Sequence, residues 1–364
     1  MSIGFFPSFK RFDWILAGAV TLLLVLSSVI LYSISLSKAV PDFLNFKKQL
    51  IFIVVGLVVF LFFSAVDYKW LKSYSLVFYI AVVLLLVSVL IFGQVIRGTR
   101  GWFNFSFFNF QPVELAKLVL IIFLSKYFSR GAHEIFRFKH ILISGIFSAI
   151  LVGLVLLQPD FGSAIILFFL WFGLLSLIGP RKSHFILLLM MMALSVVAAW
   201  FFLFEDYQKA RIGSFLDPNS DPLDRGYNIS QAQIAVGSGM LWGRGIGFGP
   251  QSQLKFVPEN QTDFIFAVLA EELGFLGSFL ILFLWGVIIW RIVRIAKRSR
   301  DDFSLFFSVG VGIVFLIQLF INIGMTVGVA PVTGISLPFL SYGGSSLVAN
   351  LAMIGILESI ATKS

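Results

Sequence analysis

Acidic side chains stand at the start of, and inside, an apolar run in the C-terminal half of the sequence. Asp263 lies in "VPENQTDFIF" (257–266), where a polar segment meets the run, and Glu271 and Glu272 follow within it. A carboxylate at such a junction can serve as a general base, or it can cap the first turn of a helix. Along one helix, Glu271 and Glu272 would lie about 12–14 Å deeper than Asp263. Buried acids in a membrane have a partner or a role, so packing and function both remain open for these two.

Glu114 and Lys117 form a second constellation within "QPVELAK" (111–117). Residues three apart share one face of a helix, so the two side chains can pair. A buried pair is costly unless it is well hydrogen-bonded, which indicates that something requires it. Two interpretations stay open, a structural pair and a pair that orients a substrate pocket.

Four arginines flank the same predicted side of the molecule: Arg97, Arg100, Arg211 and Arg244. Each alone suits a contact with a lipid headgroup. Together they suit a pyrophosphate, because a guanidinium binds phosphate oxygens through two parallel hydrogen bonds. Two of them lie in a basic, aromatic loop, "IRGTRGWFNF", and one lies in the glycine-rich "GSGMLWGRGIGFG", whose backbone can approach a ligand closely.

The amino-acid composition indicates the class of protein to which these residues belong. The chain has 364 residues, of which 59% are hydrophobic and 12% charged, whereas a soluble domain averages about 25% charged residues. This composition predicts an integral membrane protein. The net charge of +9 lies between apolar runs rather than on one basic face, so we do not expect nucleic-acid binding. The first apolar run has no cleavage signal after it and is interpreted as a retained helix.

Ten runs are long and apolar enough to span a membrane as helices, which predicts an all-α fold. The long polar segment 205–262 separates the seventh run from the eighth, and no soluble domain is attached, so the chain forms one polytopic domain, 1–364. The expected helices cover 13–36, 49–66, 74–93, 112–128, 140–157, 161–179, 184–204, 263–290, 304–329 and 343–360.

Lysine and arginine residues indicate the orientation of these helices. With the N-terminus in the cytoplasm, the inner segments hold 16 of them and the outer segments 10, half of which lie in the long polar loop. Positive residues favour the cytoplasmic side, so both termini are predicted to be cytoplasmic and 205–262 extracytoplasmic. The cluster "RIVRIAKRSR" (291–300) is the strongest cytoplasmic anchor.

In this orientation, four polar motifs open helices at the outer face: "QPVELAK", "QPDFGSA", "PENQTDFIF" and "LPFLSYGGSS". Helix N-termini carry partial positive charge and free N–H groups, so four converging ends would form a pocket for an anion such as a phosphate. The simpler interpretation is that polar residues collect at helix ends. Beyond those already named, the motifs contribute to the expected pocket Asp160, Glu259, Gln261, Ser341 and Ser345.

Metal and thiol chemistry have little support in the sequence. The chain lacks Cys, and His133, His140 and His184 are scattered over segments predicted to be cytoplasmic, so a His-ligated metal site is not expected. The loop "LDPNSDPLDRGYN" resembles a calcium loop only loosely, and turn formation by Asp-Pro explains it better.

Taken together, the motifs resemble the SEDS family of cell-wall proteins, the RodA and FtsW group. The similarity covers nearly the whole chain, including "FLDPNSDPLDRGYNISQAQIAVGSG" (215–239) and "PVTGISLPFLSYGGSS" (331–346). The short N-terminus, the 364-residue length and the loop "RI…FLDP…DPLDRGYN" (211–228) look more like RodA than FtsW. Three positions depart from the family pattern: Gln261 where His is frequent, Val113 where Ser is frequent, and Arg244 where Lys is frequent.

The resemblance implies an inverting peptidoglycan glycosyltransferase in the bacterial cytoplasmic membrane. Such an enzyme joins lipid II disaccharides into β-1,4 glycan strands for cell elongation, with Asp263 as the matched catalytic acidic residue, acting as general base, and Glu114 and Lys117 lining the central cavity. Implied partners are the undecaprenyl-pyrophosphate-linked glycan, a class B penicillin-binding transpeptidase and other elongation-complex membrane proteins. A divalent cation, Mg or Mn, could assist. A lipid II flippase, a division-type polymerase and a non-catalytic scaffold remain alternatives.

Overall fold

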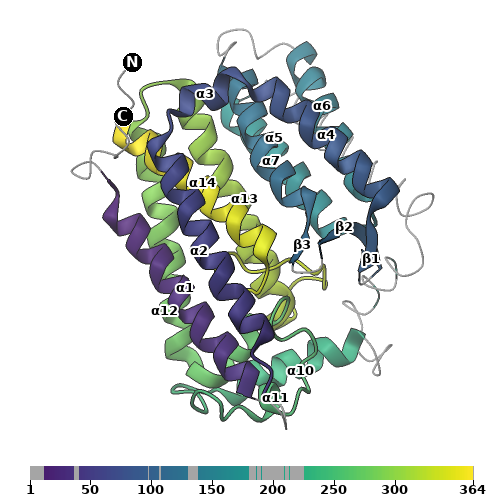
Figure 1. Cartoon of the computed structure of the whole chain (residues 1–364), viewed down its shortest axis with the longest axis vertical. Coiled ribbons are helices and arrows are strands. Elements are labelled where there is room, and N and C mark those ends of the chain that lie inside the picture. The colour runs from purple at the N-terminus through teal and green to yellow at the C-terminus, as the bar shows by residue number, and fades with distance from the viewer. Residues whose placement is uncertain are drawn as a thin grey trace.

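The computed structural model is a bundle of long helices with a small sheet and short helices at one end (Figure 1). It describes residues 12–36, 41–96, 98–105, 108–129, 138–179, 225–363 and the single positions 186, 190, 209 and 213. Eight of the helices described are long and apolar enough to cross a membrane. They are α1 (Trp14–Leu36), α2 (Leu44–Ala65), α4 (Ser75–Phe92), α6 (Phe138–Leu156), α7 (Phe161–Ile178), α12 (Ile265–Arg298), α13 (Asp302–Val327) and α14 (Gly344–Lys363).

A ninth long helix, α5 (Pro112–Ser129), runs through the middle of the bundle and carries Glu114, Lys117 and Lys126 among its 18 residues. The predicted all-α membrane fold is confirmed, and nine of the ten expected helices match described helices. α2 begins five residues before its predicted start, and α12 ends eight residues after its predicted end. The expected helix 184–204 lies outside the described residues, apart from two isolated positions.

The core lies where α5, α13 and α14 pack against one another, and α14 also packs along the length of α2. Most of α5 and α14 is buried, whereas α2 and α4 turn most of their side chains outward, as expected for helices that face lipid. Small residues permit close helix contacts in a membrane. Gly355 of α14 is one example, because a Cβ there would collide with the backbone of Phe60 in α2.

The bundle has two distinct ends. α1 begins and α14 finishes at the same end, here named the terminal end, where the short α3 (Tyr68–Ser73) also lies. Arg291 donates two hydrogen bonds to Asp13 there, and the Asp13 backbone N–H donates to Glu358 at 2.9 Å. These contacts connect α1, α12 and α14. The opposite end, named the loop end, carries α10 (Arg225–Ser238) and α11 (Pro250–Gln253).

A three-stranded antiparallel sheet also lies toward the loop end, built from β1 (Gln94–Ile96), β2 (Thr99–Phe105) and β3 (Phe108–Phe110). Residue 102 faces 94 in the first pair, and residue 104 faces 109 in the second. The sequence predicted only a basic, aromatic loop here. The run of aromatic residues has high strand propensity, so its segments can pair as antiparallel strands.

The helix that follows Asp263 is not straight. α12 is interrupted at Gly274, whose backbone has φ 66° and ψ −162°, a conformation that only glycine adopts readily. Just before this break, Glu271 accepts hydrogen bonds from the backbone N–H groups of Gln251 and Ser252 at 2.7 and 2.9 Å, and it thereby caps α11. Glu272 accepts from Ser33 Oγ at 2.6 Å. The packing interpretation therefore accounts for both glutamates.

Contacts along α1 correct the predicted depth of these glutamates. Ser27 Oγ donates to the Leu340 carbonyl, and the neighbouring Ser341 Oγ donates to the Thr262 carbonyl, next to the candidate base. Ser27 precedes Ser33 by six residues, about 9 Å of helical rise. The candidate base thus lies further from the loop end of α1 than the glutamates, and the prediction that they lie deeper is wrong. The prediction assumed that one uninterrupted helix runs inward from 263.

Candidate active site

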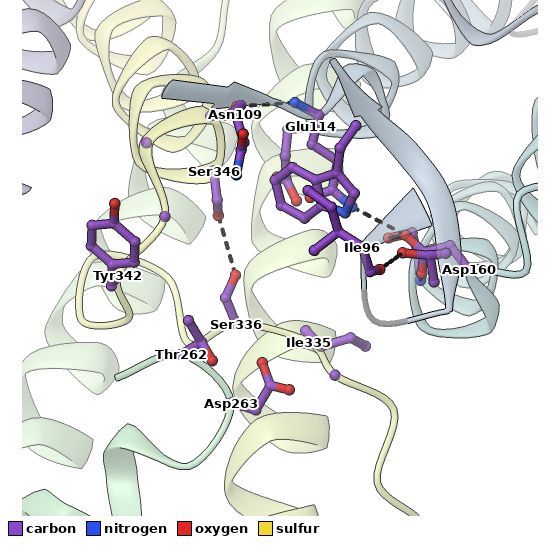
Figure 2. Close-up of a pocket in the computed structure, with 18 of the residues that line it drawn as sticks. Ile96, Asn109, Glu114, Asp160, Thr262, Asp263, Ile335, Ser336, Tyr342 and Ser346 are labelled. Carbon is purple, nitrogen blue, oxygen red and sulfur yellow. Dashed lines mark hydrogen bonds between the residues drawn. The ribbon is translucent and has the colours of Figure 1, made fainter. Parts of the chain in front are cut away.

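Four helix N-termini meet around one cavity of about 670 Å³ in the half of the bundle nearer the loop end. The starts of α5, α7 and α14 and the turn ahead of α12 all line it, as the four polar motifs predict. The small sheet forms part of its wall, through Thr99, Trp102 and Asn109 among others. Figure 2 shows how Asp160, Asp263, Ser336 and Ser346 face this common space from different segments.

Asp263 reaches the cavity from a turn that is fixed on several sides. Asn322 of α13 donates from Nδ2 to the Asp263 backbone carbonyl at 2.8 Å. The Thr262 carbonyl accepts from Ser341 Oγ at 2.6 Å, and the Gln261 carbonyl accepts from the Tyr342 N–H at 2.8 Å. The backbone around the carboxylate is therefore held by α13 and by the segment that leads into α14, a rigid mounting of the kind catalytic groups need.

Gln261 is also placed by a specific contact. Its Oε1 accepts from Asn45 Nδ2 of α2 at 2.7 Å, and both residues line the cavity. Glu259 lines the cavity from the same turn and accepts from Thr262 Oγ1 at 3.1 Å. The departure from the family pattern at Gln261 thus puts a neutral amide, which cannot exchange a proton near neutral pH, close to Asp263.

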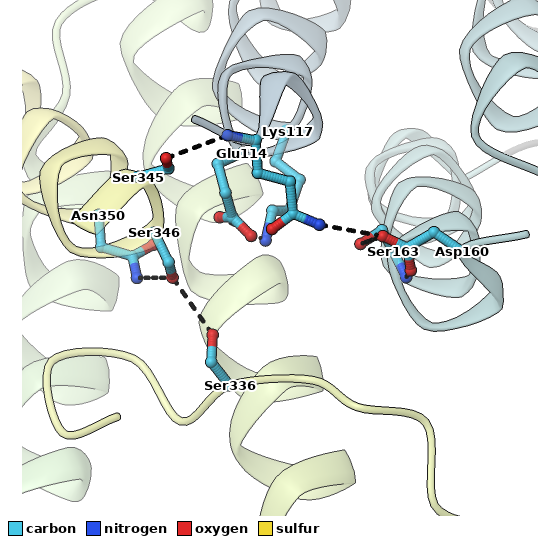
Figure 3. Close-up of polar contacts among 9 residues, drawn as sticks. Glu114, Lys117, Asp160, Ser163, Ser336, Ser345, Ser346 and Asn350 are labelled. Atoms are coloured by element: carbon cyan, nitrogen blue, oxygen red, sulfur yellow. Dashed lines mark hydrogen bonds and ion pairs between the residues drawn. The ribbon is translucent and has the colours of Figure 1, made fainter. Parts of the chain in front are cut away.

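The pair Glu114–Lys117 is formed as predicted, and it faces the cavity (Figure 3). Lys117 Nζ lies 2.7 Å from Glu114 Oε2, and the side chains are 2% and 7% exposed. Neutralising partners at this distance offset much of the cost of burying two charges. Because Lys117 remains at the cavity wall, its ammonium is placed to meet an anionic group that enters.

Asp160 stabilises the start of α7. Its carboxylate accepts from the Ser163 N–H at 2.9 Å and from Ser163 Oγ at 2.8 Å, which makes it the N-cap of the helix. Gln111 Nε2 donates to the same carboxylate at 3.3 Å. Figure 3 shows the resulting link between the beginnings of α5 and α7. Asp160 lines the cavity as predicted, with its oxygens engaged by the protein.

The two predicted serines differ in position. Ser345 lines the cavity and connects three segments, because its Oγ accepts from the Gln111 N–H and donates to the Asn109 carbonyl, both at 3.1 Å. Ser341 is buried behind the cavity wall, where its hydroxyl donates to Thr262 and accepts from the Leu337 N–H. Ser341 therefore holds the Asp263 turn in place and does not belong to the lining.

The two predicted arginines within the described residues, Arg100 and Arg244, are not brought to the cavity wall. Arg100 is exposed on β2, and its backbone N–H donates to the Gln158 carbonyl. Arg244 is exposed near the loop end, where its backbone N–H donates to the Glu271 carbonyl. Neither side chain is among the lining residues. Arg97 and Arg211 lie outside the described residues, as does the loop of Asp217, Asp221 and Asp224.

Sequence reasoning missed several lining residues. Lys48 of α2 was counted only as an outer positive charge, yet it lines the cavity and supplies a cation besides Lys117. Trp102 and Gln318 also line it, from β2 and α13. Burial raises the pKa of the Tyr342 hydroxyl, so this lining residue stays protonated in the neutral range. A polar residue isolated within an apolar helix, as Gln318 is, was the one signal available.

The described residues do not form a metal site of their own. No three His, Cys, Asp or Glu side chains among them stand close enough to hold an ion. Among the described cavity carboxylates, Glu114 and Asp160 come from separate helices and already have protein partners, while Glu259 and Asp263 share one turn. A resident Mg²⁺ or Mn²⁺ therefore does not fit these residues without further oxygen ligands.

Comparison with known proteins identifies relatives along nearly the whole chain. The family model described as a cell cycle protein, FtsW/RodA/SpoVE, matches residues 10–364. Stage V sporulation protein E of Bacillus subtilis is 39% identical over 359 residues, which cover 96% of each chain. Peptidoglycan glycosyltransferase MrdB of Escherichia coli K12 is 36% identical over 344 residues, which cover 94% of this chain and 93% of the relative.

Two solved structures are similar throughout. A chain from a peptidoglycan synthase complex, described as coordinating polymerization and crosslinking, superposes with a TM-score of 0.81 at 32% identity, covering 97% of this chain and 98% of that chain. Rod shape determining protein RodA of Thermus thermophilus superposes with a TM-score of 0.71 at 28% identity, covering 96% of each. With the family model spanning all but the first residues, the chain belongs to the FtsW/RodA/SpoVE family, the SEDS proteins.

Proposed function

We propose that this protein is a peptidoglycan glycosyltransferase that joins lipid II disaccharides into β-1,4 glycan strands, with Asp263 as the general base. The observation that carries the proposal is a carboxylate on a rigid turn, facing a cavity lined by helix N-termini and by Lys48 and Lys117. That arrangement combines a proton acceptor with positive potential for a pyrophosphate leaving group. Family membership and the name of the E. coli relative support the same activity.

In the proposed reaction, Asp263 accepts the proton of the acceptor sugar's 4-hydroxyl. The hydroxyl oxygen forms a bond to the anomeric carbon of the lipid-linked donor from the face opposite the pyrophosphate. The bond from that carbon to the pyrophosphate oxygen breaks, and the leaving group takes the electron pair. Positive groups that are already in place stabilise such developing charge most effectively, because they need not reorganise during the reaction. Lys117, Lys48 and the N–H groups at the helix starts are the candidates for that role.

The orientation expected from the sequence places this chemistry at the outer surface. Several Lys and Arg residues gather at the terminal end, among them Lys72, Lys126, Arg291 and Lys363, which contact neighbouring segments there. The positive-inside rule makes that end cytoplasmic. The cavity, nearer the loop end, would then receive lipid II from the extracytoplasmic side. Labelling of single cysteines introduced at each end of the bundle, in intact cells, would test this orientation.

The decisive experiment is polymerisation of purified lipid II by the purified protein in detergent. Detergent micelles have no leaflets, so a flippase gives no signal in this assay. We expect glycan strands from the wild type and a loss of at least about 100-fold in rate for Asp263→Asn, the usual contribution of a general base. Asp302→Asn is the matched control, because Asp302 is exposed at the terminal end, and it should keep full activity. Equal rates for the wild type and Asp263→Asn would overturn the assignment of the base.

A crosslinking partner is part of the proposal. One similar chain was solved within a peptidoglycan synthase complex that couples polymerization to crosslinking. We therefore propose that a class B penicillin-binding transpeptidase binds this chain and increases its activity. The polymerisation assay should be run with and without the transpeptidase encoded in the same genome, and a wild type that stays inactive in both would count against the polymerase.

An elongation role, as in RodA, is the finer proposal. The loop "FLDPNSDPLDRGYN" supports it, while the relatives named above include proteins of sporulation and of rod shape. Expression in rod-shaped bacteria depleted of either RodA or FtsW would separate the two roles. Restored rod shape in the first strain is the expected result, and restored division in the second strain alone would contradict it.

A further inference from the structure

Two fully buried amides lie four residues apart on α13 and differ in their hydrogen bonding. Asn322 donates from Nδ2 to the backbone carbonyls of Asp263 and Ile335, each at 2.8 Å. Gln318, one turn away, has no hydrogen-bond partner for Oε1 or for Nε2 within the described part of the chain, and it lines the cavity. Buried polar side chains nearly always have partners, so an unpaired amide at a cavity wall indicates a group prepared for a ligand.

Thr333 contributes a second neutral group to the cavity wall. Thr333 Oγ1 is likewise buried without a partner among the described residues, and Thr333 lines the cavity. Its backbone carbonyl lies against Gly162, at the start of α7. Gln318 and Thr333 thus add both donors and acceptors to a cavity whose cations are Lys48 and Lys117.

The chemistry of these two groups indicates which part of a substrate they suit. A phosphate offers acceptor atoms only, so it would leave the Gln318 Oε1 unpaired, and the lysines already provide for it. A sugar hydroxyl or an acetamido group both donates and accepts. We propose that Gln318, together with Thr333, forms a sugar-binding subsite that recognises such a group on the hexosamine of the substrate. The proposal rests on the glycosyltransferase function proposed above.

Binding measurements on the purified full-length protein test the subsite without requiring turnover. Gln318→Met keeps the shape of the side chain and removes its hydrogen-bonding groups. We expect the variant to bind lipid II about tenfold more weakly, the effect of one lost hydrogen bond, while its affinity for undecaprenyl pyrophosphate, which lacks the sugar, stays unchanged. Equal weakening toward both ligands, or unchanged affinity for lipid II, would overturn the proposal.

Thermal stability distinguishes a ligand-binding amide from a structural one. Gln49 is the matched control, since it is equally buried but is engaged by Ser27, Ser341 and Gly343 at 3.4 Å each. Gln318→Met should leave the melting temperature unchanged or raise it, because an unpaired polar group is removed. Gln49→Met should lower it, while the ratio of the two ligand affinities stays as in the wild type. A drop for Gln318→Met as large as that for Gln49→Met would make Gln318 structural.

A third comparison identifies the sugar group. If the acetamido group is the contact, an analogue of lipid II with hydrogen atoms in place of the acetamido groups should bind the wild type and Gln318→Met equally. If the tenfold difference persists with this analogue, a hydroxyl is the contact. Failure of the wild type to polymerise lipid II in either the presence or the absence of its transpeptidase would count against the proposed function. A Gln318→Met variant with wild-type affinity for lipid II would count against the subsite alone.

Discussion

At the terminal end, buried charge joins helices to one another, whereas in the cavity it faces a space that a ligand can enter. Arg291 and Asp13 connect α12 to α1, and the Asp13 N–H extends the connection to Glu358 of α14. In the cavity, Glu114 and Lys117 belong to one helix, so their ion pair does not join α5 to another segment. A pair that fixes no interface and lies at a cavity wall is more easily explained by binding than by stability.

Breaking the terminal cluster should have the largest effect on stability. Arg291→Met removes the donor that neutralises Asp13 and leaves its carboxylate buried beside Glu358. We expect a loss of about 3–5 kcal/mol in the free energy of unfolding, as is usual when one partner of a buried pair is removed. Thermal unfolding in detergent would measure it, with Lys297→Met, at an exposed position of the same helix, as the control. Polymerase activity per folded molecule should remain normal, and its loss would weaken the contrast between the two ends.

Breaking the Glu114–Lys117 pair should reduce activity more than stability. Glu114→Gln leaves Lys117 without its counter-charge, but at a cavity wall the ammonium can still be hydrated. We expect a stability loss of about 1–3 kcal/mol, smaller than that for Arg291→Met. Polymerisation of lipid II should fall by at least about tenfold, since the orientation of Lys117 toward the leaving group is lost. A large loss of stability with normal activity would make this pair structural.

A backbone substitution next to the candidate base should have an intermediate effect. Gly334 has φ 75°, and a Cβ there would lie 3.6 Å from Asp263 Oδ2. Gly334→Ala should cost about 1–2 kcal/mol through the strain of a left-handed conformation. Because the added Cβ would touch the carboxylate of the base, the activity should fall further than the stability alone explains. Gly179→Ala, with φ 70° at the end of α7 and open space around it, is the matched control for strain.

The sequence predicted the helices well because their signal is local. Apolar runs bounded by polar residues locate a spanning helix without knowledge of its neighbours, and Pro112 and Asp160 mark the starts of α5 and α7 to within a residue. The convergence of the four polar motifs followed from the alternating direction of successive helices. The same logic failed at Gly274, because one glycine in an apolar run does not show that the backbone will change direction there.

The cavity lining was predicted only in part, because it depends on contacts between distant segments. Arg100 and Arg244 are positively charged and lie toward the loop end, as predicted. Strand pairing of β2 and the contact of the Arg244 backbone with Glu271 nevertheless leave both side chains exposed and outside the cavity lining. Lys48 has the same charge and is turned inward by the packing of α2 against α14. Side-chain direction of this kind cannot be read from residue type and order alone.

The smallest expected effect is on stability at alkaline pH, where two tyrosines at opposite ends of the bundle can be compared. Burial raises the pKa of Tyr68, at the terminal end, and of Tyr342, at the cavity, above the ordinary value of 10.0. A raised pKa means that the folded state keeps its proton longer than the unfolded state does. The stability contributed is therefore fully present below pH 10 and is lost as the pH rises through the folded pKa.

Replacing either tyrosine by phenylalanine should therefore reduce the drop in melting temperature between pH 8 and pH 11. The two variants should differ at pH 8, where both hydroxyls are protonated. Tyr68→Phe removes a hydrogen bond to Asp301 of 3.1 Å and should cost about 1 kcal/mol. Tyr342→Phe should cost less stability at pH 8 and should instead weaken lipid II binding, because Tyr342 is a lining residue of the cavity. If Tyr342→Phe destabilised the protein as much as Tyr68→Phe and left binding intact, the cavity hydroxyl would be a structural group like that at the terminal end.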